Sequence, residues 1–209
     1  MKKLEHISQN TNDLILSEIN KESTNVILPQ SFPETELREI EQYFFSDDVL
    51  EKIVSSLYYE DDIVCLCTPA VADAFYRLKE KTVVCLDLDK RFNYLPLYQY
   101  YDLLKPHEIE IKPKIIIIDP PFFKINLVDL YKCIEYLTRG DKSTKIIMAY
   151  VHREERALLS IFKSYGLKLT KFKLEYRNVD SSKWNNYALY ANFECNKIKF
   201  YQKNKKNVK

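Results

Sequence analysis

The residues Asp119, Pro120, Pro121 and Phe122 place a carboxylate, two prolines and an aromatic ring directly after the apolar run 115–118. Because proline has no backbone N–H, the two prolines end a strand while their carbonyl oxygens stay free to accept hydrogen bonds. The Asp119 carboxylate and the Pro120 carbonyl could orient the N–H bonds of an amine beside the flat Phe122 ring. Such positioning of a nitrogen lone pair favours a direct displacement. The alternative is a plain turn in which the acid caps the following helix.

The apolar run at 115–118 predicts where this loop lies in the fold. Four consecutive isoleucines are apolar on both faces, which is typical of a parallel strand buried between two helical layers. Asp119 follows the last isoleucine and therefore marks the carboxyl end of the strand. Ligands of open α/β sheets bind outside this end, so the loop is a candidate site.

Strand-like and helix-like patterns alternate along most of the chain. We predict strands at 62–68, 82–89, 114–119 and 144–151, and a short one within 90–104. Helices are predicted at 69–81, 126–139 and 153–165. Two final strands, at 167–177 and 186–194, follow one another without a helix. This order predicts an α/β fold with a doubly wound, mostly parallel seven-stranded sheet and an antiparallel hairpin at its edge.

Two helices are predicted before the first strand. The first begins at Thr35 and places Leu37, Ile40 and Phe44 on one face. The second begins with Ser46 as its N-cap and has two acids in its first turn. We expect three parts in the chain: an N-terminal arm and linker (1–34), a domain (35–201) and a basic tail (202–209).

Composition narrows the class of protein. A chain of 209 residues with 46% hydrophobic residues can bury one substantial core, and a formal net charge of +2 falls short of a dedicated nucleic-acid binder. The five cysteines form no CxxC pair, no apolar run approaches the roughly 20 residues that span a bilayer, and no signal peptide is evident. We therefore expect reduced thiols and a cytoplasmic protein. His6, His107 and His152 share no metal-like spacing, so we expect no metal.

The loop from Asp119 to Phe122 resembles the [DN]PP[FYW] motif of amino-group methyltransferases that use S-adenosylmethionine, whose Rossmann-like class I fold has the order of elements given above. From Leu37 to Glu194, five segments resemble successive landmarks of the elongation factor 1A lysine methyltransferase 1 family, which was first labelled as N6-adenine-specific DNA methyltransferases. These segments are "EQYFFS", "LDLDKRF", "IIDPPF", "EYLTRG" and "YRN...NYALYANFE". A sister group, the zinc-knuckle ribosomal-RNA adenine methyltransferases, shares "QY", an "LDxD"-like strand end and "DPPF", so these three do not separate the two groups.

The resemblance implies methyl transfer to a lysine ε-amine on a protein, with elongation factor 1A as the substrate. It implies catalytic roles for Asp119, Pro120 and Phe122, and substrate contacts for Pro121 and Phe123. The alternative is N6 methylation of adenine in DNA or RNA, because the same acceptors would serve an exocyclic amine and the aromatic ring would stack on a flipped base. A catalytically dead binding subunit of the same fold is a third hypothesis, against which the intact loop argues.

The expected cofactor site lacks the glycine-rich loop of most methyltransferases. Only two glycines occur in the chain, so close backbone approach after the first strand must be made with Thr68, Pro69 and Ala70. The named family has a similar glycine-poor turn. Asp87 and Asp89 end the second strand, where an acid commonly accepts hydrogen bonds from ribose hydroxyls. Their spacing of two places both on one face of an extended strand, and the sequence leaves the choice between them open.

One segment before the first strand resembles the part of related amino methyltransferases that closes over the methionine end of the cofactor, although ordinary helix packing is the alternative. Its candidate cofactor contacts are Gln42, Tyr43, Phe45 and Ser46. Arg91 could pair with an acid or with the cofactor carboxylate, and we expect Asp119 to contact the cofactor as well. Trp184 lies between the last two strands, in a loop that overhangs the carboxyl edge in this fold and is a candidate substrate lip.

Overall fold

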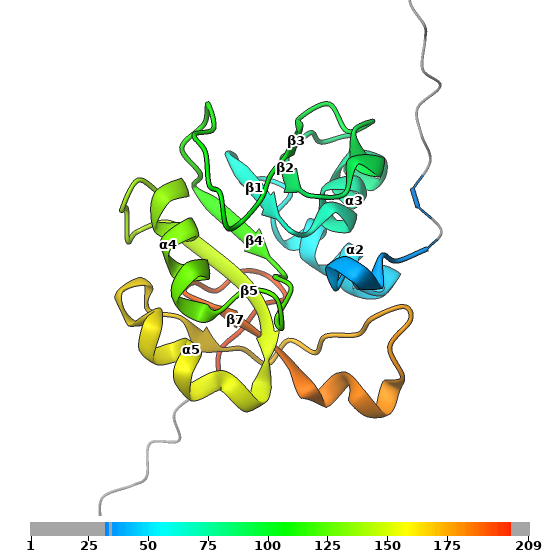
Figure 1. The fold of residues 1–209 in the computed structure, drawn as a ribbon. Coiled ribbons are helices and arrows are strands. Elements are labelled where there is room, and N and C mark those ends of the chain that lie inside the picture. Colours follow the sequence, from blue (N-terminus) through cyan, green and yellow to red (C-terminus); the bar gives the residue numbers. More distant parts are fainter. Residues whose placement is uncertain (1–31, 34, 202–209) are drawn as a thin grey trace, which may run out of the picture. The chain divides into compact units, whose positions relative to one another are not determined.

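A seven-stranded sheet with the order β3-β2-β1-β4-β5-β7-β6 forms the centre of the fold (Figure 1). The structure is a computed structural model and describes residues 32–33 and 35–201; the expected tail and all but two residues of the expected arm lie outside this part. The strands are β1 (Ile63–Leu66), β2 (Val84–Asp87), β3 (Tyr98–Tyr100), β4 (Ile115–Ile118), β5 (Lys145–Val151), β6 (Lys168–Leu169) and β7 (Tyr187–Ala191). The first five are parallel, and β7 pairs antiparallel with β5 and β6. The predicted fold class is confirmed.

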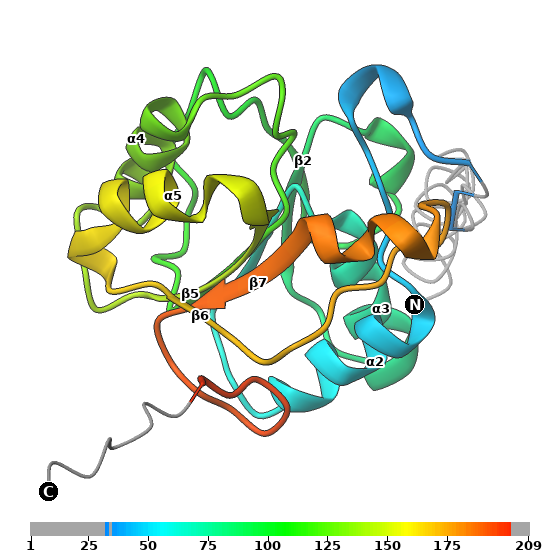
Figure 2. The same cartoon turned by 90° about the horizontal axis from the view of Figure 1, so that it is seen from below.

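Alternate residues of the central strands enter two different cores. Ile115 and Ile117 pack in a cluster with residues of α2 (Asp47–Ser56) and α3 (Pro69–Lys79). Ile116 and Ile118 pack in a second cluster with residues of α4 (Leu127–Leu137) and α5 (Glu155–Ile161). Figure 2 shows the two helix pairs on opposite faces of the sheet. Because each buried isoleucine contributes about 1.5–3 kcal/mol, β4 is a strong anchor for the loop that follows it.

The predicted helix boundaries rest on identifiable caps. The Ser46 hydroxyl accepts a hydrogen bond from the Val49 N–H at 3.4 Å at the start of α2, as expected for an N-cap. Pro69 is the first residue of α3. Gly140 follows α4 with a φ of 76°, a left-handed conformation that favours glycine after a helix.

The helix predicted from Thr35 is wrong. Only a short 3-10 turn forms, Arg38–Ile40, and Glu41 ends it in the left-handed region with a φ of 55°. The chain is then extended as far as Phe45, which pairs with Tyr176 through an isolated antiparallel bridge. The apolar residues whose spacing imitated a helix therefore line a loop instead.

The strand predicted at 167–177 is much shorter than expected. Only Lys168–Leu169 pairs with β7, as β6. The alternation of buried and exposed residues continues beyond it, but Phe172, Leu174 and Tyr176 pack in the core cluster on the α2 and α3 side instead of continuing the sheet. The alternation of apolar and polar residues thus predicts burial correctly and strand pairing wrongly.

All five cysteines are free, and Cys65, Cys85 and Cys133 are buried. Within residues 32–33 and 35–201, no helix is both long and apolar enough to cross a membrane.

Candidate active site

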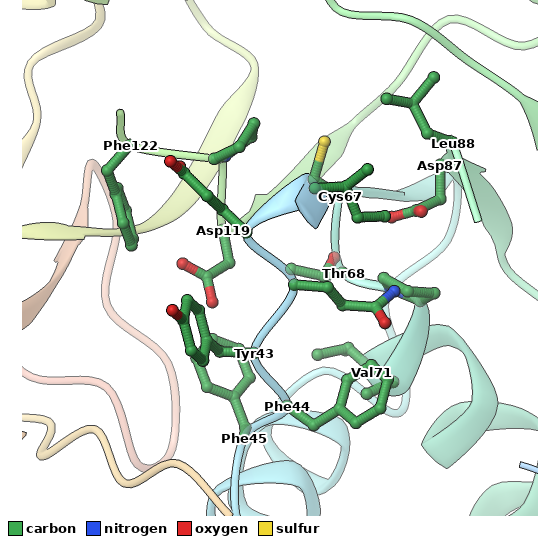
Figure 3. A pocket seen from close by; sticks show the side chains of 16 residues that line it. Tyr43, Phe44, Phe45, Cys67, Thr68, Val71, Asp87, Leu88, Asp119 and Phe122 are labelled. Carbon is green, nitrogen blue, oxygen red and sulfur yellow. The ribbon is translucent and has the colours of Figure 1, made fainter. Parts of the chain in front are cut away.

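The carboxyl ends of β1, β2 and β4 meet at a cleft, which the segment 40–45 also lines. Figure 3 shows Asp119 and Phe122 on one side of this cleft, Asp87 and Leu88 on the other, and Thr68 between them. Nine predicted site residues line the cleft: Gln42, Tyr43, Phe45, Thr68, Pro69, Asp87, Asp119, Pro121 and Phe122. Six others do not: Ser46, Asp89, Arg91, Pro120, Phe123 and Trp184.

Asp119 follows the last residue of β4 and is half-buried. Its carboxylate accepts a long hydrogen bond, 3.5 Å, from the hydroxyl of Tyr176. Burial raises the pKa of Asp119 well above the ordinary value of a carboxyl group, and the Tyr176 hydroxyl offsets this only in part. No lysine or arginine of the described residues forms an ion pair with it. The carboxylate therefore remains available to an incoming group.

The two prolines of the loop differ in a way that the sequence did not indicate. The Pro121 carbonyl accepts hydrogen bonds from the N–H groups of Lys124 at 3.0 Å and Ile125 at 3.1 Å, so the expectation that it stays free is wrong. The buried Pro120 accepts none of the loop, turn or cap hydrogen bonds from backbone N–H groups in the described part of the chain. Pro120 thus remains the candidate backbone acceptor beside Asp119.

Aromatic rings surround the loop, and three of them were missed in the sequence. Phe122 packs edge to face with Tyr150, 5.3 Å between ring centroids, and tilted against Tyr187 at 5.7 Å. Tyr176, which donates to Asp119, lies 5.0 Å from Tyr187 and 5.2 Å from Phe45. The only signal for Tyr176 and Tyr187 was their place inside one of the landmark segments.

The turn from β1 into α3 reaches the cleft without glycine. Cys67, which was not predicted as a site residue, adopts a φ of 53°, a left-handed conformation uncommon for a side chain that is not glycine. The Thr68 hydroxyl donates a hydrogen bond to the Ile117 carbonyl at 3.1 Å, and Pro69 then begins α3. These contacts hold the turn against β4.

Asp87 and Asp89 have different environments, contrary to the expectation that both lie on one face of a strand. Asp87 is the last residue of β2, lines the cleft and is buried, and burial raises its pKa to about 7. Asp89 lies beyond the strand, where its side chain accepts a hydrogen bond from the Arg91 N–H at the start of the next 3-10 turn. The Asp89 carboxylate also accepts from the Gln42 amide at 2.8 Å and pairs with the Arg91 guanidinium at 2.7 Å. Of these two acids, Asp87 is thus the one that lines the cleft and forms no ion pair with a lysine or arginine of the described residues.

Arg91 pairs with an acid, one of the two options that the sequence left open for it. Its guanidinium also donates to the Thr35 carbonyl and to the Gln42 side-chain oxygen, both at 2.9 Å. Next to Gln42 in the same segment, the Glu41 carboxylate accepts a hydrogen bond from the Phe123 N–H at 2.9 Å. We call residues 35–46 the cover segment, since it is attached both beyond β2 and at the Asp119 loop.

The remaining predicted residues lie around the cleft instead of inside it. The Ser46 hydroxyl is used in the cap of α2, and Phe123 is 72% exposed. Trp184 lies in the 3-10 segment Ser181–Asn186. Its indole N–H donates a hydrogen bond to the Val179 carbonyl, just before this segment, at 2.9 Å. This segment leads into β7 at the carboxyl edge of the sheet, where the loop was expected. Among the described residues, no group of three or more His, Cys, Asp or Glu side chains could hold a metal ion.

The doubly wound sheet with an antiparallel β7, the acid at the end of β2 and the Asp-Pro-Pro-Phe loop at the end of β4 define a class I methyltransferase. The model of the probable N6-adenine methyltransferase family matches residues 36–195, and the chain belongs to this family. This match confirms the resemblance that the landmark segments indicated. The chain is therefore an N-methyltransferase, and S-adenosylmethionine is the methyl donor of its class.

Individual proteins are also similar to this chain. This chain is 28% identical over 188 residues to the protein-lysine N-methyltransferase EFM5 of Saccharomyces cerevisiae. The aligned region covers 78% of this chain and 74% of that protein. A solved S-adenosylmethionine-dependent methyltransferase from Clostridium acetobutylicum has a TM-score of 0.48 and 13% identity, with 81% of this chain and 94% of that chain covered. Magnesium protoporphyrin IX methyltransferase from Synechocystis has a TM-score of 0.45 and 12% identity, with 73% and 78% covered.

Proposed function

We propose that this chain methylates a lysine ε-amine on a protein, and that the protein is elongation factor 1A in the cytoplasm. The observation that carries the proposal is Asp119, a half-buried carboxyl among aromatic rings, at a cleft and without a cation partner. The similarity to a protein-lysine N-methyltransferase supports a protein acceptor. The landmark segments support elongation factor 1A in particular.

The properties of Asp119 suit a lysine better than an adenine. A lysine, with an ordinary pKa of about 10.4, arrives as an ammonium group and must lose a proton before its nitrogen has a lone pair. A carboxylate whose pKa is raised accepts a proton more readily than an ordinary one. Asp119 can therefore take this proton, and the Pro120 carbonyl can accept a second N–H and orient the amine. The exocyclic amine of adenine is neutral at pH 7 and needs no such base.

N6-adenine methylation is the second candidate, favoured by the label of the family and by the aromatic residue in the loop. A flipped base would need a free ring face for stacking. Phe122 already contacts both Tyr150 and Tyr187, which limits the ring surface that a base could use. The alkyl chain of a lysine needs no free ring face.

We propose that the cleft beside Asp119 holds S-adenosylmethionine. The residues present fit this cofactor: Asp87 can accept the ribose hydroxyls, the turn at Cys67 and Thr68 brings backbone close, and Tyr43 provides an apolar wall. When bound, S-adenosylmethionine supplies an electrophilic methyl group on a positively charged sulfur. Asp89 and Arg91 do not line the cleft and instead hold the cover segment in place, whereas Gln42 bonds to both of them and also lines the cleft.

Asp87→Asn is expected to weaken binding of the product S-adenosylhomocysteine by about tenfold or more, because a hydrogen bond to a charged group contributes about 1.5–3 kcal/mol. Since the pKa of Asp87 is about 7 before binding, the affinity of the unaltered protein should also fall as the pH drops from 8 to 6. Isothermal titration at both pH values measures the two effects.

Asp102→Asn is the matched control for this prediction, because Asp102 also follows a strand, β3, but does not line the cleft. The variant should bind S-adenosylhomocysteine as the unaltered protein does. If Asp87→Asn kept both its affinity and its pH dependence, Asp87 would not be the ribose ligand.

The acceptor can be tested directly with a radiolabelled methyl group. The protein is incubated with labelled S-adenosylmethionine and either purified elongation factor 1A or a whole-cell extract, and samples are then treated with protease or nuclease. We expect label on elongation factor 1A that protease removes and nuclease does not. Label that only nuclease removes would replace the lysine assignment with the adenine one. Protease-sensitive label on another protein would retain lysine and remove elongation factor 1A.

A further inference from the structure

A second groove adjoins the Asp119 loop. It lies between Phe123, the end of β5 with Arg153 just beyond it, and the start of β7 at Tyr187. We call it the lip groove. It shares no lining residue with the cleft, but its wall residue Tyr187 has its ring 5.7 Å from that of Phe122, which lines the cleft. The lip groove is therefore only one aromatic layer away from the reactive loop.

Phe123 is an exposed aromatic side chain in a fixed position. It is 72% exposed, while its backbone N–H is held by the Glu41 carboxylate at 2.9 Å. The guanidinium of Arg153 lies over its ring, 5.6 Å from the centroid. Phenylalanine and arginine are both enriched at protein interfaces, so this pair is a candidate contact surface.

The charges around the lip groove favour a short polypeptide over a nucleic acid. The Arg153 side chain is 66% exposed, and the nearest ion pair recorded for it, with Glu154, is a loose one of 3.9 Å. Two exposed amides, Asn185 and Asn186, line the opposite side and can bond to a peptide backbone. Glu41 and Glu154 carry negative charge close to Phe123, which would repel a run of phosphates.

We propose that the lip groove binds the polypeptide segment beside the target lysine, and that Arg153 pairs with an acidic side chain in that segment. The proposal rests on the proposed function, since it requires a protein acceptor whose lysine reaches Asp119. Residues of an extended chain advance by about 3.3 Å each, so positions a few residues from the lysine can reach from the loop to the lip groove. Arg153 would then select the sequence around the lysine without taking part in catalysis.

Fluorescence anisotropy with two labelled synthetic peptides tests the proposal. Each peptide carries a single lysine, flanked on both sides by glutamate in one and by glutamine in the other, and binding is measured with S-adenosylhomocysteine present. We expect the glutamate peptide to bind about tenfold more tightly than the glutamine peptide, as one well-placed charge pair allows. Arg153→Gln should remove this difference, and Arg153→Glu should make the glutamate peptide the weaker of the two.

Arg156→Gln is the matched control, because Arg156 is an exposed arginine only three residues further along, in α5, but does not line the lip groove. It should keep the tenfold preference. Equal affinity for the two peptides, no binding of either, or a preference that survives in Arg153→Gln would overturn the proposal. So would a single-stranded oligonucleotide that binds more tightly than both peptides and loses affinity in Arg153→Gln. Failure of the proposed function is a separate result: no label on elongation factor 1A although the peptides are still discriminated.

Discussion

Asp119→Asn is expected to lower the rate of methyl transfer by about 10³-fold, the size of effect typical of losing a positioned proton acceptor. The amide keeps the shape of the side chain but cannot take a proton from an ammonium group. Affinity for S-adenosylhomocysteine should change little, because Asp87 and the turn at Thr68 remain. Single-turnover transfer to elongation factor 1A and isothermal titration measure the two quantities separately.

The same substitution should raise the melting temperature at neutral pH. Burial raises the pKa of Asp119 above its unfolded value of about 3.9, so between these two values the folded protein binds more protons than the unfolded one. The free energy of unfolding therefore falls as the pH rises through this window. Above the window the charged Asp119 carboxylate destabilises the folded state. The gain in melting temperature of Asp119→Asn should be largest near pH 8 and vanish towards pH 4.

Asp61→Asn serves as the control, because Asp61 is exposed and lies before β1, at the opposite end of that strand from the cleft. It should change neither the transfer rate nor the melting temperature appreciably. An Asp119→Asn protein that kept a tenth or more of the rate would remove the proton acceptor from the mechanism. Equal losses of rate and of S-adenosylhomocysteine affinity would instead make Asp119 a cofactor ligand, a role that the sequence also suggested.

The sheet and the reactive loop were predictable because their signals are local. Four isoleucines in succession require burial on both faces, and an acid followed by two prolines ends such a strand at the ligand-binding edge. The neighbouring strands β1 and β2 are likewise apolar runs that are buried at every residue. The alternation of strands and helices, and the position of the Asp119 loop at the end of a buried strand, therefore followed from pattern.

The cover segment was not predictable, because distant residues determine its conformation. Its apolar spacing fits a helix, yet the chain is held in an extended path by Arg91 and Asp89, and the hydrogen bond from Gln42 to Asp89 joins positions 47 apart. That same contact decides which acid faces the cleft, so the choice between Asp87 and Asp89 could not be made from a strand pattern. Tyr176 reaches Asp119 from 57 positions away, and no local periodicity encodes such a pair.

Arg91→Ala is expected to lower the free energy of unfolding by about 2–3 kcal/mol at pH 7. The Asp89 side chain is only 2% exposed, and removal of its cation leaves a buried charge with weaker compensation. This value is below the full cost of breaking a buried pair, because Arg91 itself is partly exposed. For a chain of this size each kcal/mol corresponds to about 2–4 °C, which differential scanning calorimetry resolves easily. Lys114→Ala, which removes an exposed partner of Asp62, should leave the melting temperature nearly unchanged.

The pH dependence separates loss of this ion pair from loss of mere packing. Burial pushes the pKa of Asp89 up, but hydrogen bonds from Arg91 and Gln42 outweigh it, so the pKa lies below its ordinary value. A carboxyl of this kind stabilises the fold above its unfolded pKa of about 3.9, and the stabilisation is lost as the pH falls through the folded value. The gap between the unaltered protein and Arg91→Ala should thus narrow below pH 4, whereas lost packing would give a constant gap. Arg91→Lys, which keeps the charge but not the two-pronged contact, should lie between them.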